Sequence, residues 1–201
     1  MRITSNSKEV VNFLYEVGIL SKTPRSGFFF LGSGNQSVAE HVNRMCYIGY
    51  ALSMLDGSAN TEKIIKMCLF HDLAEARTSD LNYVHQKYTK REDFRAVEDL
   101  TSLLPFGDDI KEILDEYESQ ETREAHLAKD ADQLEWIISL KEQVDIGNSR
   151  AEGWIPSGIK RLKTKYGKDL AHIIINTNSQ EWWFDDPEDD WWVNRGKKIN
   201  Q

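Results

Sequence analysis

The sequence predicts an all-α protein. Apolar residues recur with the 3.6-residue spacing of helices along most of the chain, and no segment shows the convincing alternation of a half-buried strand. A capping box opens one of these segments, and glycines and a proline separate others. The chain has 201 residues, no internal repeat and no low-complexity linker, so we expect one domain with a full core.

The first predicted helix is short, and Gly18 is expected to end it. Residues 25–36 are then expected to form a loop, because glycines surround their apolar run. The apolar face of the helix comprises Val10, Val11, Phe13, Leu14 and Val17, and the loop glycines are Gly27, Gly32 and Gly34.

A capping box predicts the start of the next helix. Ser37 would accept a hydrogen bond from the amide three residues on, and Glu40 would reach back to the Ser37 amide. This helix should extend to about Leu55 and carry His41 in its first turn. A further helix begins near Asn60 and ends in a polar stretch considered below.

The second half of the chain continues the helical pattern. A loop at Gly153, Pro156 and Gly158 separates the last predicted helix, in which Gly167 marks a potential break. Helices are predicted at about 91–104, 108–118, 121–147 and 159–180. An acidic tail at 185–190 is flanked by Trp182, Trp183, Trp191 and Trp192. Paired tryptophans of this kind favour coverage of core or of a subunit interface over substrate stacking.

Composition excludes several classes of protein. The net charge of −8 argues against a protein that binds nucleic acid polymers, which needs a basic face. No apolar run approaches the ~20 residues that cross a bilayer, and the N-terminus lacks the apolar segment of a secretory signal. The two cysteines, Cys46 and Cys68, lie among apolar neighbours and are expected to be buried thiols of a cytoplasmic protein.

The adjacent pair His71-Asp72 is the most informative feature of the chain. It lies at the end of an apolar helix, where charge is costly unless it is paired or bound to a metal. His41 lies thirty residues upstream and Asp132 sixty downstream. The short connection at about 56–60, between the helix that carries His41 and the next helix, favours antiparallel neighbours, which would bring His41 beside the pair. Two imidazoles and two carboxylates suit Mn, Fe, Co, Ni or Zn rather than Ca.

Three further polar residues extend this set. Glu75 follows His71 by four residues, so the two should share one helix face. From there Glu75 could deprotonate an attacking water or protonate a leaving oxygen. Asp80 lies just past the helix end, where it could contact a substrate hydroxyl, and the Arg25 fork suits a phosphate group.

Each residue alone has an ordinary interpretation. A lone His41 at a helix start is usually a surface or capping residue, and the dipeptide His71-Asp72 recurs by chance. Asp132 could be a solvated helix acid, and Asp130 competes with it as a ligand. The ordered combination on an all-α scaffold favours the metal site.

The ordered set resembles the HD-domain metal-dependent phosphohydrolase superfamily, named for its His-Asp pair, and more narrowly its 5′-deoxynucleotidase branch. The resemblance implies a single compact helical HD domain over residues 1–201, with its core at about 10–145 and C-terminal helices and a Trp-rich tail at 146–201. The matching stretches are Pro24-Arg25-Ser26-Gly27, Ser37-Val38-Ala39-Glu40-His41, His71-Asp72-Leu73-Ala74-Glu75, Ser79-Asp80-Leu81 and Lys129-Asp130-Ala131-Asp132-Gln133.

The resemblance also implies a role for each site residue. Glu75 would act on the attacking water, Arg25 would hold the phosphate, and Asp80 would face the sugar hydroxyl as part of the catalytic set. One divalent transition-metal ion would be bound, and Asp132 rather than Asp130 aligns with the family's last metal acid. The four implied metal ligands are His41, His71, Asp72 and Asp132.

The chain departs from the family pattern at two substrate contacts. Ser26 replaces a Trp that follows the phosphate-binding Arg in the bacterial nucleotidases, and Ser79 replaces the Gly of Gly-Asp-Leu. Two-metal HD phosphodiesterases need extra histidines, but the spacing of His85 and His126 does not match theirs. His172 has no partner in the pattern and is expected to be structural.

The predicted activity is removal of phosphate from nucleoside 5′-monophosphates, in particular deoxynucleotides, by a cytoplasmic enzyme. Because related nucleotidases are commonly dimers, a homodimer is expected. Two alternatives stay open at this point. The enzyme could act on a nucleoside triphosphate, a cyclic dinucleotide or another phosphate ester, or the HD scaffold could be a non-catalytic ligand-binding or dimerisation module.

Overall fold

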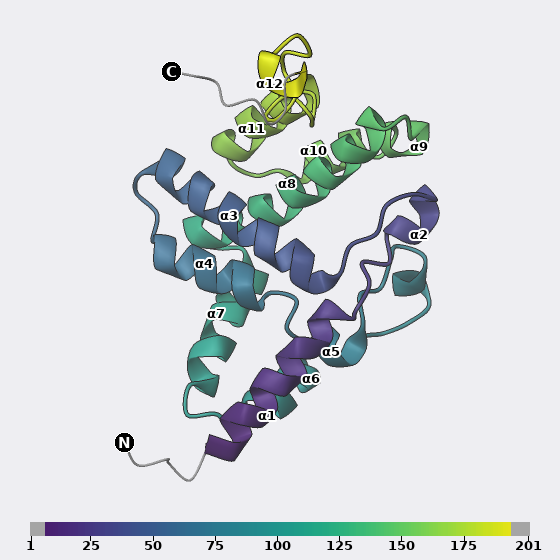
Figure 1. Ribbon diagram of the computed structural model, residues 1–201. Coiled ribbons are helices and arrows are strands. Elements are labelled where there is room, and N and C mark those ends of the chain that lie inside the picture. The colour runs from purple at the N-terminus through teal and green to yellow at the C-terminus, as the bar shows by residue number, and fades with distance from the viewer. Residues whose placement is uncertain (1–6, 194–201) are drawn as a thin grey trace.

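A computed structural model describes residues 7–193 of the chain, and within that range every regular element is a helix (Figure 1). The one β-type pairing there is an isolated antiparallel bridge between Pro24 and Ser37. The elements are α1 (Ser7–Val17), η1 (Gly18–Ser21), α2 (Phe28–Leu31), α3 (Val38–Asp56), α4 (Thr61–Phe70), α5 (Glu75–Thr78), η2 (His85–Lys87), α6 (Asp93–Thr101), α7 (Gly107–Ser119), α8 (Arg123–Asp145), α9 (Ser149–Glu152), α10 (Ile155–Arg161), α11 (Lys165–Asn176) and α12 (Asp190–Val193). The predicted all-α class is confirmed.

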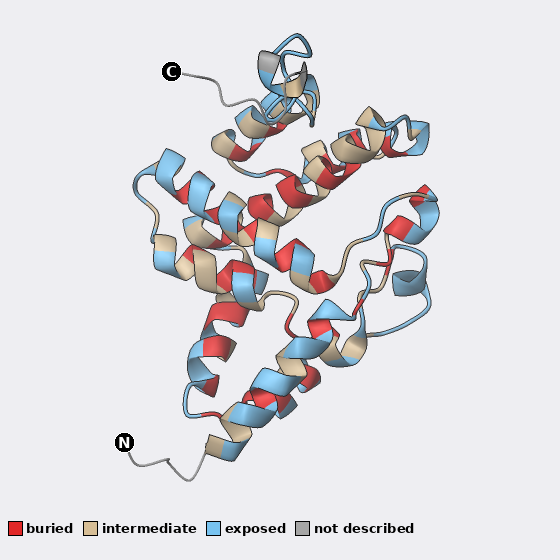
Figure 2. Ribbon diagram, viewed as in Figure 1, coloured by how far each residue is buried: buried red, intermediate tan, exposed pale blue. Residues whose placement is uncertain are grey.

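The long helix α8 forms the centre of the molecule. It packs against α3, α4, α7, α9, α10 and α11. Figure 2 shows buried residues following α3 and α8 through the middle of the view. A helix surrounded by neighbours has no solvent face over most of its length, so its apolar residues are spread around it. Its residues Leu127, Leu134, Ile137 and Leu140 are all fully buried in the main hydrophobic core.

A second, smaller core lies at the end of the molecule that carries α1. It joins α1, α6 and α7 and includes Phe13, Leu100, Ile110 and Leu73. Leu73 belongs to the turn after α4, whereas residues within α4 belong to the main core. The chain therefore crosses from one core to the other between Phe70 and Glu75, which is where the His-Asp pair lies.

The helix start predicted from the Ser37 capping box and the start predicted near Asn60 are both confirmed. The Ser37 hydroxyl accepts a hydrogen bond from the Glu40 amide, and the Glu40 carboxylate accepts one from the Ser37 amide at 2.6 Å. The Asn60 side chain likewise accepts a hydrogen bond from the Lys63 amide at the start of α4. These caps place His41 in the first turn of α3, fully buried.

Several predicted boundaries are wrong. The expected loop at 25–36 contains the short helix α2. The first helix does end at Val17, immediately before Gly18 as predicted, although Gly18 then starts a 3-10 turn. The helix expected to carry Glu75 ends at Phe70. Pro156 and Gly158 lie inside α10, because Pro is well tolerated in a first helical turn.

The last predicted helix breaks at residues 162–164, before Gly167. Asp130 causes this break, because its carboxylate accepts hydrogen bonds from the Lys163 and Thr164 amides and from the Thr164 hydroxyl, at 2.6 to 2.8 Å. Gly167 then lies so close that a Cβ there would stand 2.3 Å from an Asp130 oxygen. The glycine permits the approach of α11 to α8 and does not break the helix.

Other predictions concern the cysteines and the C-terminal segment. Cys68 is buried and Cys46 half-buried, and both are free thiols as expected. In the tail Trp183 contacts Phe184 and Trp192, while Trp182 is 86% exposed. None of the described helices combines the length and apolar character needed to cross a bilayer. The C-terminal helices share the main core through Ala151, Ile155, Leu162 and Ala171, which supports the prediction of one domain.

Candidate active site

Three helical segments bring the four predicted metal ligands together. His41 comes from α3, His71 and Asp72 from the turn after α4, and Asp132 from α8. His41 Nε2 lies 3.3 Å from His71 Nε2 and 3.3 Å from Asp132 Oδ1. Asp72 Oδ2 lies 3.1 Å from His71 Nε2 and 3.7 Å from His41 Nε2. Ligand atoms of His41, His71 and Asp132 therefore form one compact group, and Asp72 borders it beside the two histidines.

Both histidines are oriented by the nitrogen that faces away from this cluster. His41 Nδ1 donates to Glu135 Oε2 at 2.6 Å, and His71 Nδ1 donates to the Cys68 carbonyl at 3.0 Å. A carboxylate and a carbonyl only accept hydrogen bonds, so each Nδ1 carries a proton. In a neutral ring Nε2 then presents its lone pair to the cluster, as a metal-ligating histidine does.

The donor set fits a divalent transition metal. Two atoms each about 2.1 Å from an ion, at the angles of tetrahedral or octahedral sites, lie roughly 3.0 to 3.4 Å apart. The distances in the cluster are 3.1 to 3.7 Å. Ligand atoms of His41, His71 and Asp132 form one compact group, and residues 7–193 hold no second group of this kind.

The charge of the cluster also favours a cation. Burial opposes ionisation of Asp72 and Asp132, but His71 beside the first and His41 beside the second hold both carboxyl pKa values well below their usual range. Burial and Arg25 oppose protonation of His41, yet its bonds to Asp132 and Glu135 raise its pKa to about 9. A metal bound at Nε2 would replace that proton, because a ligating imidazole is neutral.

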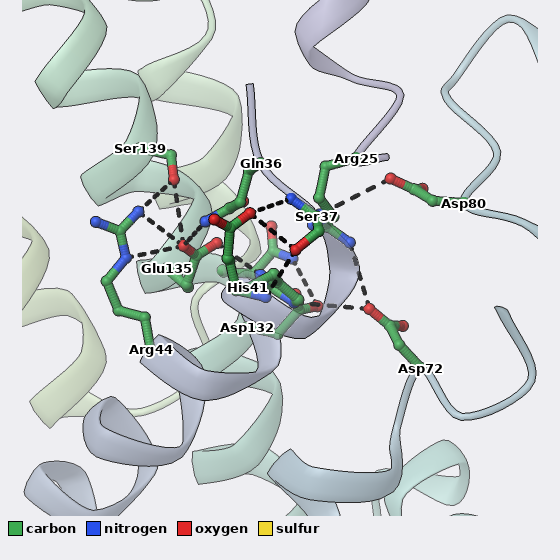
Figure 3. Close-up of polar contacts among 12 residues, drawn as sticks. Arg25, Gln36, Ser37, His41, Arg44, Asp72, Asp80, Asp132, Glu135 and Ser139 are labelled. Carbon is green, nitrogen blue, oxygen red and sulfur yellow. Dashed lines mark hydrogen bonds and ion pairs between the residues drawn. The ribbon is translucent and has the colours of Figure 1, made fainter. Parts of the chain in front are cut away.

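Glu135 is a site residue that the sequence analysis missed. It is fully buried on α8, and besides His41 it receives hydrogen bonds from Arg44 at 2.9 Å, Gln36 at 2.7 Å and Ser139 at 3.2 Å (Figure 3). Burial raises the pKa of Glu135, but the hydrogen bond from His41 and the charges of His41 and Arg44 lower it to about 2. The ionised carboxylate fixes the His41 ring.

A sequence signal for this support existed. Glu135 follows Asp132 by three residues and Arg44 follows His41 by three, so each shares a helix face with a ligand. Reciprocal charges at matching positions on two candidate ligand helices indicate an ion pair between them.

The competing acid Asp130 is excluded as a ligand. It is fully buried, and both of its oxygens accept hydrogen bonds at the break before α11. Two residues along a helix point to nearly opposite faces. Asp132 therefore faces the cluster while Asp130 faces the C-terminal helices.

Arg25 and Asp80 border the same cluster. Arg25 donates to Asp72 Oδ2 at 3.3 Å, and its Nε lies 3.8 Å from Asp80 Oδ2. The Ser26 amide donates to the Asp80 carboxylate at 2.9 Å, and the Ser26 hydroxyl donates to the Asp80 carbonyl at 2.8 Å. Ser26 is buried, so the residue that departs from the family pattern clamps the Asp80 loop to the Arg25 loop.

Ser79, the second departure, has a strained backbone. Its φ of 61° and ψ of 161° lie in a region that glycine alone adopts freely. A glycine would adopt this turn before Asp80 without strain, whereas Ser79 adopts it at a cost in stability.

Glu75 begins the separate short helix α5. The prediction that it shares a helix with His71 is wrong, but both side chains line one cavity. Glu75 is buried, Arg91 donates to its Oε1 at 2.9 Å, and its Oε2 has no hydrogen-bond partner within the described residues. Burial and the charges of Asp72 and Asp80 raise its pKa to about 8. Such a carboxyl can take up or release a proton near neutral pH.

The cavity above the cluster is about 520 Å³, a size typical of small-molecule sites. His41 lies beneath it, in the interior. The predicted site residues that line the cavity are Arg25, His71, Asp72, Glu75, Asp80 and Asp132. Neither His126 nor His172 lines it, and His85 is instead paired with Asn82.

Comparisons with known proteins identify the family of the chain. The family model for the HD domain matches residues 17–174. The 5′-deoxynucleotidase HDDC2 of Bos taurus is 32% identical over 149 residues, which is 71% of this chain and 71% of that protein. The 5′-deoxynucleotidase hdd1 of Schizosaccharomyces pombe is 34% identical over 69% of this chain and 74% of its own length.

Solved structures share the fold. A conserved hypothetical protein from Pyrococcus furiosus superposes with a TM-score of 0.69 at 27% identity, covering 83% of this chain and 99% of that one. The helical scaffold, the matched residues and the relatives all point to one assignment. The chain belongs to the HD domain family.

Proposed function

We propose that this protein is a metal-dependent phosphomonoesterase that removes phosphate from deoxynucleoside 5′-monophosphates. The observation that carries the proposal is the compact group of ligand atoms from two oriented imidazoles and Asp132, with Asp72 beside it, at the base of a cavity. Arg25, Glu75 and Asp80 line the same cavity. The relatives named 5′-deoxynucleotidase support the choice of substrate.

His41, His71, Asp72 and Asp132 would hold one divalent ion of Mn, Co, Fe, Ni or Zn. Such an ion supplies Lewis-acid stabilisation of phosphoryl charge and a more acidic water. Glu135 and the Cys68 carbonyl keep the two imidazoles in the ligating tautomer.

The chain's other residues bind substrate and move protons. Arg25 would donate its guanidinium hydrogens to the phosphate oxygens, since a bound phosphate competes with Asp72 and Asp80 for that fork. Asp80 would accept a hydrogen bond from a sugar hydroxyl. Glu75 would accept the proton of the attacking water, and Arg91 keeps one of its oxygens fixed while the other is free.

A phosphatase panel tests the proposal. The protein, stripped with a chelator and reloaded with Mn²⁺ or Co²⁺, is assayed with deoxy and ribo 5′-monophosphates, a deoxynucleoside triphosphate and a cyclic dinucleotide. We expect the deoxy monophosphates to be hydrolysed faster than the other esters of the panel, and we expect no turnover after chelation. Preferred turnover of the triphosphate or the cyclic dinucleotide would overturn the substrate assignment.

Variants then test the metal assignment. Asp132→Ala should lose both bound metal and turnover, whereas Asp108→Ala, an exposed acid on α7, should keep both. Full metal content and full turnover in Asp132→Ala would contradict the ligand set. Absence of bound metal in the unaltered protein, purified without chelators, would favour a non-catalytic HD module.

We also propose that the enzyme is a homodimer in the cytoplasm. Exposed apolar side chains on one face of α3 support an interface there: Tyr47, Tyr50 and Met54 are 72%, 53% and 59% exposed. Light scattering at micromolar concentration would give twice the chain mass, and a single chain mass would contradict the proposal.

A further inference from the structure

A second cavity adjoins the active-site cavity. Its volume is about 300 Å³, and Tyr83, Trp136 and Arg161 line both spaces. Its remaining wall comes from α10 and the turn before it, including Trp154. We call the four side chains Tyr83, Trp136, Trp154 and Arg161 the aromatic annex.

The annex begins one helical turn from the metal cluster. Trp136 follows Asp132 by four residues on α8, so the two side chains share a face and are offset by about 6 Å along the helix axis. In a nucleoside 5′-monophosphate one sugar unit separates the phosphate from the base. The base of a nucleotide whose phosphate lies at the cluster is therefore within reach of Trp136, which lines the same cavity.

The Trp136 ring is held in a fixed position. Phe28 contacts it edge-on with ring centroids 5.4 Å apart, and Trp154 lies 6.2 Å away at 43°. A Cβ added to Gly27 would stand 3.2 Å from its rim, so the ring packs closely on the loop that carries Arg25. A fixed, half-buried indole that borders a cavity offers a stacking surface to a planar heterocycle.

Tyr83 supplies aromatic surface from a different segment. It follows Asp80 by three residues and is 48% exposed. The Arg161 guanidinium donates to the Tyr83 hydroxyl at 2.5 Å and lies 5.1 Å from the ring centroid. Arg161, at the end of α10, thereby links the Asp80 segment to the C-terminal helices.

Arg161 differs from the other cations of the cavity wall. Within the described residues it forms no ion pair, and its guanidinium donates to Tyr83 alone. A guanidinium has five N–H donors, so most of the Arg161 fork is available to a ligand. The other cations pair with acids: Arg25 with Asp72, Arg91 with Glu75 and Lys129 with Glu118.

We propose that the aromatic annex is the nucleobase subsite, in which Trp136 and Tyr83 contact the ring faces and Arg161 donates to base oxygen and nitrogen acceptors. This proposal rests on the proposed function, because the phosphate must be held at the cluster. Guanine offers O6 and N7 as a matched pair of acceptors for an arginine fork, whereas adenine places a donor beside N7. The annex therefore favours guanine over adenine.

The test compares substrates with and without a base. Tyr83→Ala and Arg161→Met are assayed with dGMP, dAMP and 2-deoxyribose 5-phosphate. We expect kcat/KM for dGMP to fall about tenfold in each variant, as for the loss of one stacked or hydrogen-bonded base contact. The loss with 2-deoxyribose 5-phosphate should be much smaller, and Arg161→Met should affect dGMP more than dAMP.

Matched controls lie beside both residues. Tyr88 belongs to the same segment as Tyr83, is 85% exposed and lines neither cavity, and Lys160 precedes Arg161 on α10. Tyr88→Ala and Lys160→Ala should keep the dGMP preference of the unaltered enzyme. Equal losses with all three substrates, or no loss with dGMP, would overturn the annex as a base subsite.

Failure of the proposed function would look different. If the unaltered enzyme hydrolyses none of the three esters, that function is wrong and the annex is tested by titration calorimetry with unphosphorylated deoxyguanosine. Weaker binding to Tyr83→Ala and Arg161→Met than to Tyr88→Ala would still support the subsite. Equal binding to all of them, or no binding to the unaltered protein, would overturn it.

Discussion

The two sides of the active site are built differently. The metal side is built around long helices: His41 and Asp132 lie on α3 and α8, and His71-Asp72 form the turn that directly follows α4. A buried carboxylate, Glu135, supports His41. The substrate side uses irregular backbone, with Arg25 before α2 and Asp80 after α5. Metal binding therefore depends mainly on helix packing, whereas substrate choice depends on two loops joined by the Ser26–Asp80 hydrogen bonds.

Glu75 stands where the two sides meet, and its loss should have the largest effect. Glu75→Gln keeps the size of the side chain but cannot accept a proton, so turnover should fall about 10²- to 10⁴-fold. Bound metal, measured by elemental analysis, should stay at the level of the unaltered enzyme. Lost metal would show that Glu75 supports metal binding, and unchanged turnover would contradict its catalytic role.

The metal side is tested through Glu135. Glu135→Gln weakens the acceptor for His41 Nδ1 and should lower metal affinity about 10- to 100-fold, with turnover recovering at high metal concentration. Glu142→Gln is the matched control, since Glu142 pairs with the same Arg44 but does not contact His41. If both variants lose metal affinity to the same extent, the ion pair with Arg44, and not the hydrogen bond to His41, supports the site.

Arg91 tests the electrostatics at the junction. Its charge lowers the pKa of Glu75, so Arg91→Met should raise that pKa above about 8. A base acts in its ionised form, and the acidic limb of the pH–rate profile should therefore move to higher pH. Each unit by which the Glu75 pKa rises should lower activity on the acidic limb about tenfold.

The control for Arg91 is Arg95→Met, on the exposed face of α6. Its pH–rate profile should match that of the unaltered enzyme. An acidic limb displaced to lower pH in Arg91→Met would contradict the role of Glu75 as the proton acceptor.

Ser79→Gly should have the smallest effect, and it tests the backbone strain on the substrate side, in the turn before Asp80. Glycine relieves the strained backbone, offset in part by its greater freedom in the unfolded chain, for a net gain of about 1 kcal/mol. The melting temperature should rise by about 2 to 4 °C. Ser102→Gly, at a residue with ordinary helical φ and ψ, should instead lower it. A lower melting temperature in Ser79→Gly would show that the serine stabilises the turn.

Local signals in the sequence predicted the parts of the fold that local chemistry decides. The Ser37 capping box placed His41 in the first turn of α3, and the apolar pattern placed the start of α4 near Asn60. The family pattern chose Asp132 over Asp130, and the hydrogen bonds of Asp130 exclude it as a ligand.

Parts that depend on distant packing were not predicted. The end of α4 at Phe70 follows from the passage of the chain between two cores, which no local pattern reveals. The break before α11 depends on Asp130, thirty-three residues away. Arg91 lies at the start of the helix predicted at about 91–104, but its hydrogen bond to Glu75, at the start of α5, had no signal in the sequence.

The approach of Gly167 to Asp130 has a mechanical consequence. Asp130 holds the backbone just after Arg161, while Asp132 and Trp136 on the same helix face the cluster and the annex. One rigid helix thus sets the distance between the phosphate-binding and base-binding ends of the site. Because both ends depend on α8, the spacing between them stays fixed, and a substrate of matching length contacts both ends at once.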